Sequence, residues 1–342
     1  MPGPSRREFA GALLAPGLTL LAPALPRESS EPSFVSPRQG WTAGYVKLAR
    51  TGELRKRARE LRSIYQSCRL CPRQCGVNRR RGQTGVCSST ARAKVFSFDR
   101  RFAEERPLTG TRGSGAIFFS NCNLLCAYCQ NWEINHRGDG EWVSDRQLAD
   151  IMLHLQEMGC HCIDLVTPTH IVPNIVSALE IAAGRGLGLP LVYNCGGYES
   201  LEAIRLLDGI IDVYLPDFKY LDGEIAAELS SGARDYPERA AEVIKEMHRQ
   251  VGELVVDEEG IALRGLIVRH LILPDNLAGT DKFVQWVARE LSPYTMVNLM
   301  GQYWPAHQAH RFPRLSRRIS LAEYLRAFEW ARAAGLKRLY TS

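Results

Sequence analysis

Three cysteines with the spacing C-x3-C-x2-C stand at Cys122, Cys126 and Cys129, directly after the apolar run at residues 115–119. Such a run predicts a buried strand, so the thiols are expected on the loop that leaves its carboxyl end. Three thiolates can hold three irons of a cubane cluster and leave one iron open to a small molecule, whereas electron-transfer clusters use four cysteines. A zinc knuckle needs a second pair of Cys or His ligands, and none follows closely enough to complete one. The spacing therefore indicates a [4Fe-4S] cluster with an open iron.

These residues resemble the radical S-adenosylmethionine (SAM) superfamily, whose C-x3-C-x-aromatic-C pattern is matched by the three cysteines and Tyr128. The flanking residues 120–124 and 129–131 are similar to the pyruvate formate-lyase activating enzyme branch, and within it to PflX-type proteins. The resemblance implies that SAM binds the open iron and that an electron from the cluster cleaves it to methionine and a 5′-deoxyadenosyl radical. It also implies a low-potential electron donor of the flavodoxin or ferredoxin type.

A second cysteine set lies upstream, at Cys68, Cys71, Cys75 and Cys87, with the spacing C-x2-C-x3-C-x11-C and glycines between. In a reducing compartment, four cysteines this close indicate a metal site rather than disulfides. Zinc and a second iron–sulfur cluster both fit, and two disulfides are a third option if the protein is exported. This set also resembles the N-terminal motif of PflX-type proteins. The simplest activating enzymes lack it, which weakens an activase assignment.

Short apolar segments alternate with helical patterns from residue 113 onward, which is typical of β/α units and a parallel sheet. Strands are predicted at 116–119, 162–167, 191–194, 211–215, 266–273 and 295–299, and helices from about 145, 173, 200, 237, 279 and 321. Six units predict a partial, open barrel, as the resemblance also implies. We therefore expect an α/β protein with a partial (β/α)6 radical SAM barrel and C-terminal helix at 113–342. A helical, Cys-rich metal module is expected at 41–112, and a signal and linker at 1–40.

Polar residues follow several of these strands, where the chemistry of α/β barrels gathers. The loop after the second strand takes the place of the activating enzymes' Gly-Gly-Glu segment but lacks its glycines and glutamate. Asp217 and Lys219 match that family's Asp-x-Lys and point to one face of a strand, although a plain salt bridge is the alternative. Arg269 is suited to bind a carboxylate. The residues expected to contact SAM or line its site are Tyr128, Thr167, Thr169, Asn194, Asp217, Lys219 and Arg269.

Other residues near these loops have more than one interpretation. His170 is either a ligand contact or a helix-start residue, and Cys195 is more typical of packing than of radical relay. Cys160 and Cys162 are expected to be core thiols at the opposite end of the barrel. Candidate substrate contacts are Gln302, Tyr303 and Trp304.

The first forty residues carry a possible address signal. A twin-arginine pattern between Ser5 and Ala10, with Arg6 and Arg7, precedes a moderately apolar run to residue 25. Prolines and the short length of the run argue against a membrane anchor, so we expect the segment to be either an export signal or a Pro-rich tail. Export suits a folded cofactor protein, whereas SAM and low-potential donors favour the cytoplasm, so both locations stay open.

The formal charge of +6 comes largely from arginine clusters at 55–59, 79–81 and 314–318. No nucleic-acid-binding motif accompanies them, so a solvated basic face is expected, with no specific nucleic acid. Three functions remain: a radical SAM enzyme acting on an unidentified substrate, an activase that places a radical on a glycine of a partner protein, and a non-catalytic iron–sulfur or zinc scaffold. The intact cysteine loop on a β/α barrel favours an enzyme.

Overall fold

The computed structural model describes residues 40–341, and these belong to one unit. The expected signal between Ser5 and Ala10 lies outside the described residues. Within residues 40–341, no helix is long and apolar enough to cross a membrane.

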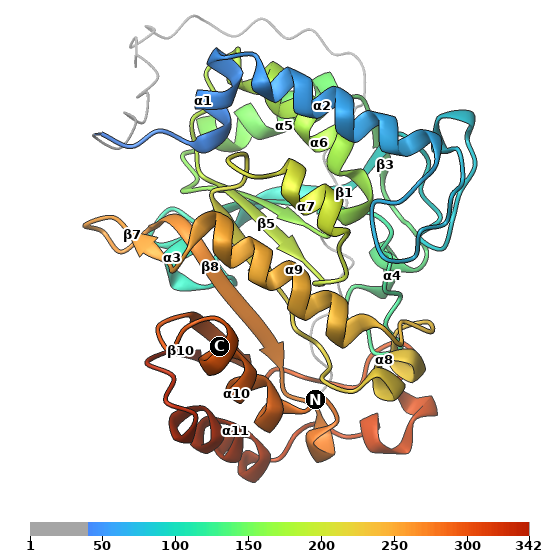
Figure 1. The fold of residues 1–342 in the computed structure, drawn as a ribbon, viewed down its shortest axis with the longest axis vertical. Helices are drawn as coiled ribbons and strands as arrows, with labels where there is room; N and C mark the ends of the chain where they lie inside the picture. The colour runs from blue at the N-terminus through green and yellow to red at the C-terminus, as the bar shows by residue number, and fades with distance from the viewer. Residues whose placement is uncertain (1–39, 342) are drawn as a thin grey trace, which may run out of the picture. The chain divides into compact units, whose positions relative to one another are not determined.

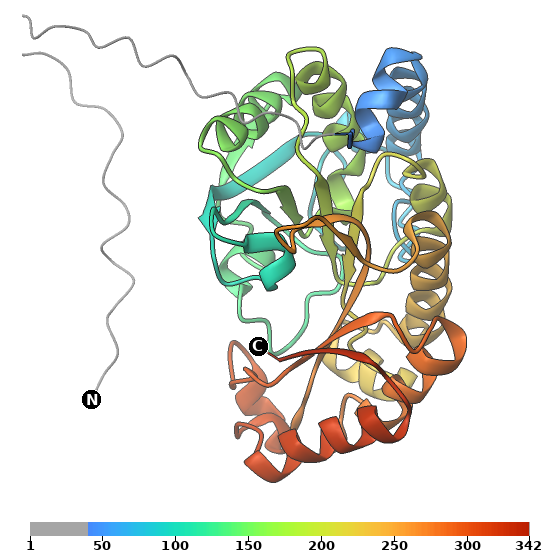
Figure 2. The ribbon, with the colours of Figure 1, turned by 90° about the vertical axis from the view of Figure 1, so that its left-hand side faces the viewer.

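The centre of the protein is a ten-stranded sheet with the order β10-β9-β8-β6-β5-β4-β2-β1-β3 and β7 paired to β8. Its parallel strands are β2 (Ser114–Phe119), β4 (Ile163–Val166), β5 (Leu191–Cys195), β6 (Val213–Pro216), β8 (Ala262–Leu271), β9 (Met296–Met300) and β10 (Arg338–Thr341). In Figure 2 they run from the teal and green strands to the orange and red ones. The six predicted strands are all present, and β10 adds a seventh parallel strand. The first and last strands do not pair, so the predicted partial, open barrel is confirmed.

One edge of the sheet carries strands that the β/α pattern did not predict. β1 (Ala93–Arg101) pairs antiparallel with β2, and β3 (Glu141–Val143) pairs antiparallel with β1. They cover the edge that β2 would otherwise expose to other chains. The alternation in β1 is interrupted by a register shift between Val95 and Ser97, so that Ala93 and Val95 are buried whereas Phe96 and Phe98 are exposed. β7 (Val255–Val256) forms a short antiparallel pair with β8.

Helices follow the parallel strands, as expected of β/α units (Figure 1). They are α5 (Asp145–Glu157), α6 (Val172–Ala183), α7 (Leu201–Leu206), α9 (Tyr236–Val251), α10 (Thr280–Glu290) and α11 (Leu321–Ala333). Three further helices lie in the connections: α3 (Arg106–Thr109), α4 (Trp132–Asn135) and α8 (Gly223–Leu229). Reciprocal capping boxes start α5 at Ser144 and α11 at Ser320, which satisfies amide groups that a helix start leaves without partners.

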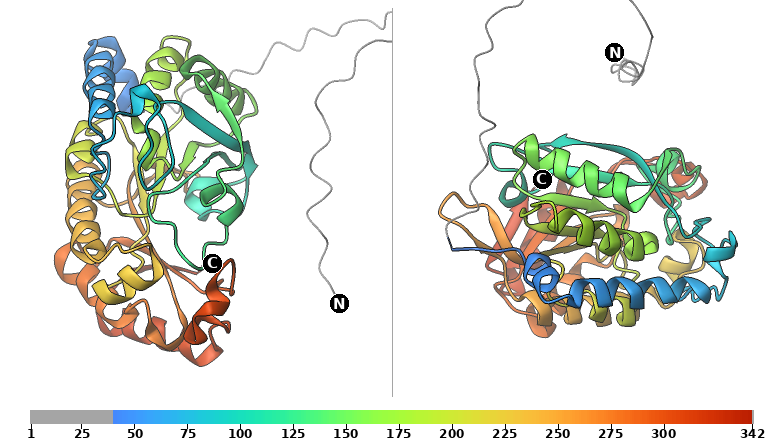
Figure 3. Two further views of the ribbon diagram at one scale, coloured as in Figure 1. Left: turned by 90° about the vertical axis from the view of Figure 1, so that its right-hand side faces the viewer. Right: turned by 90° about the horizontal axis from the view of Figure 1, so that it is seen from above.

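The N-terminal segment packs directly on the barrel. α1 (Gly44–Arg50) leads into α2 (Glu53–Ser63), which lies beside α6 and α7 (Figure 3). The buried side of α2 carries Leu54, Ala58 and Leu61. The cysteine-rich loop follows α2, and the Arg73 guanidinium fastens it to the barrel by donating to the carbonyls of Asn123, Ser230 and Ser231. The two cysteine sets are thereby held at the same end of the barrel.

Candidate active site

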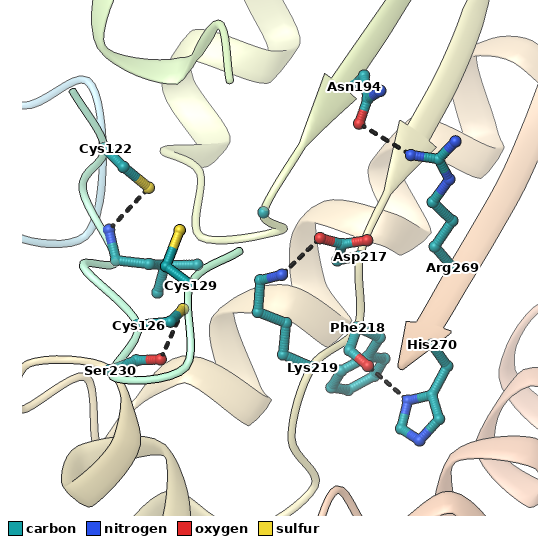
Figure 4. A network of polar contacts seen from close by, with 12 residues as sticks. Cys122, Cys126, Cys129, Asn194, Asp217, Phe218, Lys219, Ser230, Arg269 and His270 are labelled. Carbon is teal, nitrogen blue, oxygen red and sulfur yellow. Dashed lines mark hydrogen bonds and ion pairs between the residues drawn. The ribbon is translucent and has the colours of Figure 1, made fainter. Parts of the chain in front are cut away.

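The cysteine loop follows β2, where the sequence predicted it. Each thiol accepts a hydrogen bond. Cys122 accepts from the Leu124 amide at 3.4 Å and Cys126 from the Ser230 hydroxyl at 3.1 Å (Figure 4), and Cys129 accepts from the Asn135 side-chain amide at 3.3 Å. Burial raises the pKa of Cys122 to about 12 and that of Cys129 to about 11. Donors aimed at sulfur orient thiolate ligands and tune the metal they hold.

The backbone around this loop is held in uncommon conformations. Asn121 has φ 77°, Leu125 φ 51° and Thr167 φ 61°. Positive φ is a genuine outlier for a β-branched residue such as Thr167. Such strain persists only where the surrounding structure enforces it, and it gathers at functional sites. Here Thr167 and Leu125 line the same cavity.

A cavity of about 260 Å³ opens between the cysteine loop and the carboxyl ends of the parallel strands. Its lining includes Cys122, Cys126, Cys129, Tyr128, Thr167, Asn194, Asp217, Lys219 and Arg269. The structure therefore brings six of the seven predicted cofactor residues together with the three cysteines. Ligand sites of this kind combine a concave wall with a few convergent polar groups.

Asp217 and Lys219 meet in this cavity as an ion pair, with 2.5 Å between Lys219 Nζ and Asp217 Oδ2 (Figure 4). Burial alone lowers the pKa of Lys219, but the Asp217 carboxylate outweighs it and the pKa lies well above its usual value. The strand end beneath them is fixed by His270, whose Nδ1 lies 2.6 Å from the Phe218 carbonyl oxygen. The pair is thus a salt bridge that also lines the cavity.

Arg269 is neutralised by two carboxylates that the sequence analysis did not identify. Its guanidinium donates to Glu105 at 2.7 and 2.6 Å, to Glu104, and to Asn194 Oδ1 at 3.4 Å. Burial raises the pKa of Glu105, but Arg269 outweighs it and the pKa is lowered. Burial, reinforced by Glu104, raises the pKa of nearby Asp164 well above its usual value. Glu104 and Glu105 lie between β1 and β2, outside the β/α pattern that guided the prediction.

Thr169 and His170 do not line the cavity and instead form buried hydrogen bonds next to it. The Thr169 hydroxyl donates to Glu199 at 2.6 Å, and Thr169 is the one predicted cofactor residue that does not line the cavity. The Tyr193 hydroxyl donates to the same carboxyl at 3.0 Å, and burial raises the pKa of Glu199 to about 7. Burial lowers the pKa of His170 to about 3, so its ring is neutral. Its Nε2 lies 2.8 Å from the Ser120 carbonyl oxygen, which can only accept, so Nε2 carries the ring proton and donates this hydrogen bond. His170 also lies in the 3-10 turn that precedes α6.

The segment after β9 covers the cysteine loop. The Gln308 amide donates to the Ala127 carbonyl at 2.8 Å, and the His307 ring stacks on Trp132 with 5.3 Å between centroids. Among the candidate substrate contacts, Gln302 lines the cavity. Tyr303 is buried against Tyr128 and donates its hydroxyl to the Leu315 carbonyl, whereas Trp304 is exposed. Cys160 and Cys162 are buried, as expected of core thiols.

The four upstream cysteines line a second, smaller pocket together with Arg79, His170 and Asn123. All ten cysteines of the chain are free of disulfides. Among residues 40–341, no three Cys, His, Asp or Glu side chains converge closely enough to hold a single metal ion. The cysteines of a cubane cluster each bind a different iron and so stand further apart than the ligands of one ion. The three thiols that line the first cavity fit a four-iron cluster there.

Residues 116–258 match the family described as the Radical SAM superfamily. An uncharacterized protein of Methanocaldococcus jannaschii is 30% identical over 292 residues, which cover 82% of this chain and 78% of that protein. A domain of a pyruvate-formate lyase-activating enzyme from Bacteroides vulgatus superposes with a TM-score of 0.33 at 10% identity, covering 58% of this chain and 91% of that one. Streptococcus suis SuiB bound to S-adenosylmethionine gives a TM-score of 0.46 at 12% identity over 65% of this chain. The match covers 48%, or about half, of that structure.

Proposed function

Because the chain belongs to the radical SAM superfamily, we propose that it is an enzyme that cleaves SAM to a 5′-deoxyadenosyl radical and uses this radical to abstract hydrogen from a substrate. Cys122, Cys126 and Cys129 would hold the [4Fe-4S] cluster, which supplies the electron for cleavage when it is bound. The observation that carries the proposal is the convergence of these three thiols with the polar strand ends on one cavity.

The cavity offers complementary groups to the methionine end of SAM, which carries an ammonium and a carboxylate. Asp217 can accept hydrogen bonds from an ammonium, and Lys219 can donate to a carboxylate. The Asn194 side chain also lines the cavity, and its Oδ1 already accepts from Arg269. Because Glu104 and Glu105 neutralise Arg269, we assign Lys219 rather than Arg269 as the main cation for SAM.

The same arrangement covers one wall of the cavity. Cys126 and Tyr128 are buried, and the segment around Gln308 packs over the loop that holds them. A cavity of about 260 Å³ is at the small end of ligand sites, so SAM would occupy most of it. The substrate would then approach from the side lined by Gln130, Met300 and Gln302.

The upstream cysteines extend this proposal. We assign Cys68, Cys71, Cys75 and Cys87 to a second metal site and place the protein near the PflX-type proteins. A flavodoxin- or ferredoxin-type protein would be its electron donor. The activase alternative requires a partner protein with a target glycine, whereas the leading proposal takes a small molecule, peptide or cofactor precursor.

Anaerobic incubation of the reconstituted protein with SAM and a strong reductant tests the enzyme proposal. We expect methionine and 5′-deoxyadenosine to form in equal amounts, and Cys126→Ala to abolish both. Cys160→Ala is the matched control, because this buried thiol lies away from the cavity. Wild-type protein that forms no more 5′-deoxyadenosine than Cys126→Ala would contradict the proposal. A glycyl radical signal in a co-encoded partner, measured by electron paramagnetic resonance (EPR), would select the activase alternative.

A further inference from the structure

We propose that a basic face beside the cysteine loop is the docking surface for the electron donor, an acidic protein of the flavodoxin or ferredoxin class. The basic face consists of Arg80, Arg81, Arg92, Lys94 and Trp142. What the donor delivers there rests on the proposed function, because the electron is needed only by a cluster in the cysteine loop. The surface itself is tested by binding alone.

The chain around this face carries positive charge without acidic residues. From residue 61 to residue 98 the sequence has seven arginines and one lysine, and no Asp or Glu. Two of the arginines pair with carboxylates of the barrel helices. Arg80, Arg81 and Arg92 are exposed, and none of them has a carboxylate partner within the described residues. Uncompensated positive charge therefore gathers here and attracts an acidic surface at long range.

The arginines lie close together although they come from two segments of the chain. Arg80 and Arg81 belong to the short turn η3 (Arg79–Arg81). Its first residue donates a side-chain hydrogen bond to the Thr90 carbonyl at 2.6 Å, and its carbonyl accepts from the Ala91 amide at 3.2 Å. These two bonds hold the turn against the residues that lead directly into Arg92 and β1.

An exposed tryptophan gives the basic face an apolar anchor. Trp142 lies on β3, the strand at the edge of the sheet, and is 41% exposed. Lys94, its partner on β1, lies 5.4 Å from the centre of the ring, and the Arg92 guanidinium lies 5.7 Å from it. Tryptophan and arginine are the residues that contribute most at protein interfaces, whereas single-stranded nucleic acid needs several stacking rings along a groove. This composition favours a protein partner.

The basic face is joined to the residues that lead into Cys122. The Ser120 amide donates to the Lys94 carbonyl at 2.9 Å, and the Asn121 side chain donates to the Ser89 hydroxyl at 2.9 Å. None of the five residues of the basic face lines the cavity of the candidate active site. A donor can therefore bind next to the cysteine loop while SAM and substrate occupy the cavity.

An acidic donor fits both the charge and the position of this face. A second copy of the chain also carries a formal charge of +6, so two basic faces repel each other. In the transfer the reduced donor loses one electron and the cluster gains it, and no bond forms or breaks. Charge complementarity of this kind mainly raises the rate of association and fades as salt screens it.

Calorimetric titration of the anaerobic, reconstituted protein with a purified flavodoxin, and separately with a purified ferredoxin, tests the surface. We expect one of the two to bind, with an affinity that falls as salt rises. The basic-face variant, Arg80→Glu with Arg81→Glu, should bind it at least about tenfold more weakly. The variant Arg326→Glu with Arg332→Glu is the matched control, because it makes the same change of charge at two exposed arginines of α11.

Trp142→Ala tests the same face without changing its charge, and we expect it to weaken binding by about tenfold. Absence of binding to both donor proteins, or equal weakening in the basic-face variant and its control, would overturn the proposal. Duplex DNA or RNA that binds in place of both donors, and is released by the basic-face variant, would assign the face to nucleic acid and overturn it as well.

Reduction of the cluster without SAM separates this proposal from the proposed function. In freeze-quench EPR, the reduced donor protein should reduce the basic-face variant about tenfold more slowly than wild type, whereas dithionite, which needs no docking surface, should reduce both at the same rate. Equal rates with the donor protein would overturn the docking surface and leave the proposed function intact. Wild-type protein that holds a cluster but forms no 5′-deoxyadenosine with dithionite and SAM would contradict the proposed function and leave the docking result standing.

Discussion

The change Glu105→Gln tests the charge balance inside the barrel, because it removes one carboxylate from a buried ion pair without changing its shape. The Glu105 side chain is fully buried, and that of Arg269 is 13% exposed. Removing one partner of a buried pair costs about 3–5 kcal/mol, since the remaining charge is left without compensation. Glu104 still contacts Arg269, so we expect the lower end, about 3 kcal/mol. For a chain of 342 residues, that loss lowers Tm by about 4 °C.

Thermal and urea unfolding of the anaerobic protein, followed by circular dichroism, measure this loss. Asp150→Asn is the matched control, because its ion pair with Arg185 is about half exposed on both sides and such pairs contribute less than about 1 kcal/mol. Combining Glu105→Gln with Arg269→Met should cost less than the sum of the single changes, as expected of residues in contact. Equal stability of Glu105→Gln and Asp150→Asn would refute the reasoning.

The pH dependence of the same variant has a defined sign. The folded pKa of Glu105 lies below its ordinary value of 4.5. A carboxyl with a lowered pKa stabilises the fold above its unfolded pKa and loses this contribution as pH falls through the folded value. The stability difference between wild type and Glu105→Gln should therefore be full at pH 7 and shrink below pH 4.5. A difference that grows in acid would contradict this assignment.

Three further predictions follow from the site and its supports. Lys219→Met leaves the Asp217 carboxylate without its cation, and the loss of a charged hydrogen bond should weaken SAM binding about tenfold. Calorimetry measures this affinity, with the surface variant Lys245→Met as the control. An unchanged affinity would show that Lys219 does not contact SAM. The pKa of Glu199 is raised from 4.5 to about 7, so wild-type stability should fall as pH rises from 4.5 through 7 relative to Glu199→Gln. At about 1.4 kcal/mol for each pKa unit, the fall is about 3 kcal/mol, and parallel urea midpoints of the two proteins at pH 5 and 8 would argue against this. Fractionation of the native host tests the signal at Arg6 and Arg7, and full-length protein found only in the cytoplasm would exclude a working export signal.

The sequence predicted the barrel well because its strands are short apolar runs that end in polar residues. The loop holding Cys122 and the strand ends at Asn194, Asp217 and Arg269 could be placed together, since parallel strands end at one edge of the sheet. β10 was missed because Arg338–Thr341 is short and follows the last predicted helix. β1 was missed because several of its hydrophobic residues face outward.

The partners inside the site were harder to predict than its position. The pairing of Arg269 with Glu105 joins residues 164 positions apart, and no local sequence pattern predicts it. The sequence did hold one signal for this pairing, the adjacent acids Glu104 and Glu105 directly before Arg106 and Pro107. A buried Glu105 at a helix start needs a cation from another part of the chain. Thr169 was expected to face SAM, and its contact with Glu199 depends on the tight turn after β5.

The contact between Gln308 and Ala127 joins a late part of the chain to the cysteine loop, which is made earlier during synthesis. The chain is made from its N-terminus, so both cysteine sets and most of the sheet exist before the segment that covers the cysteine loop. Iron–sulfur delivery therefore has open access to the loop until the last part of the chain is made. Once His307 stacks on Trp132, this side of the loop is covered. The C-terminal part of the chain thus completes the site after the rest of the chain has been made.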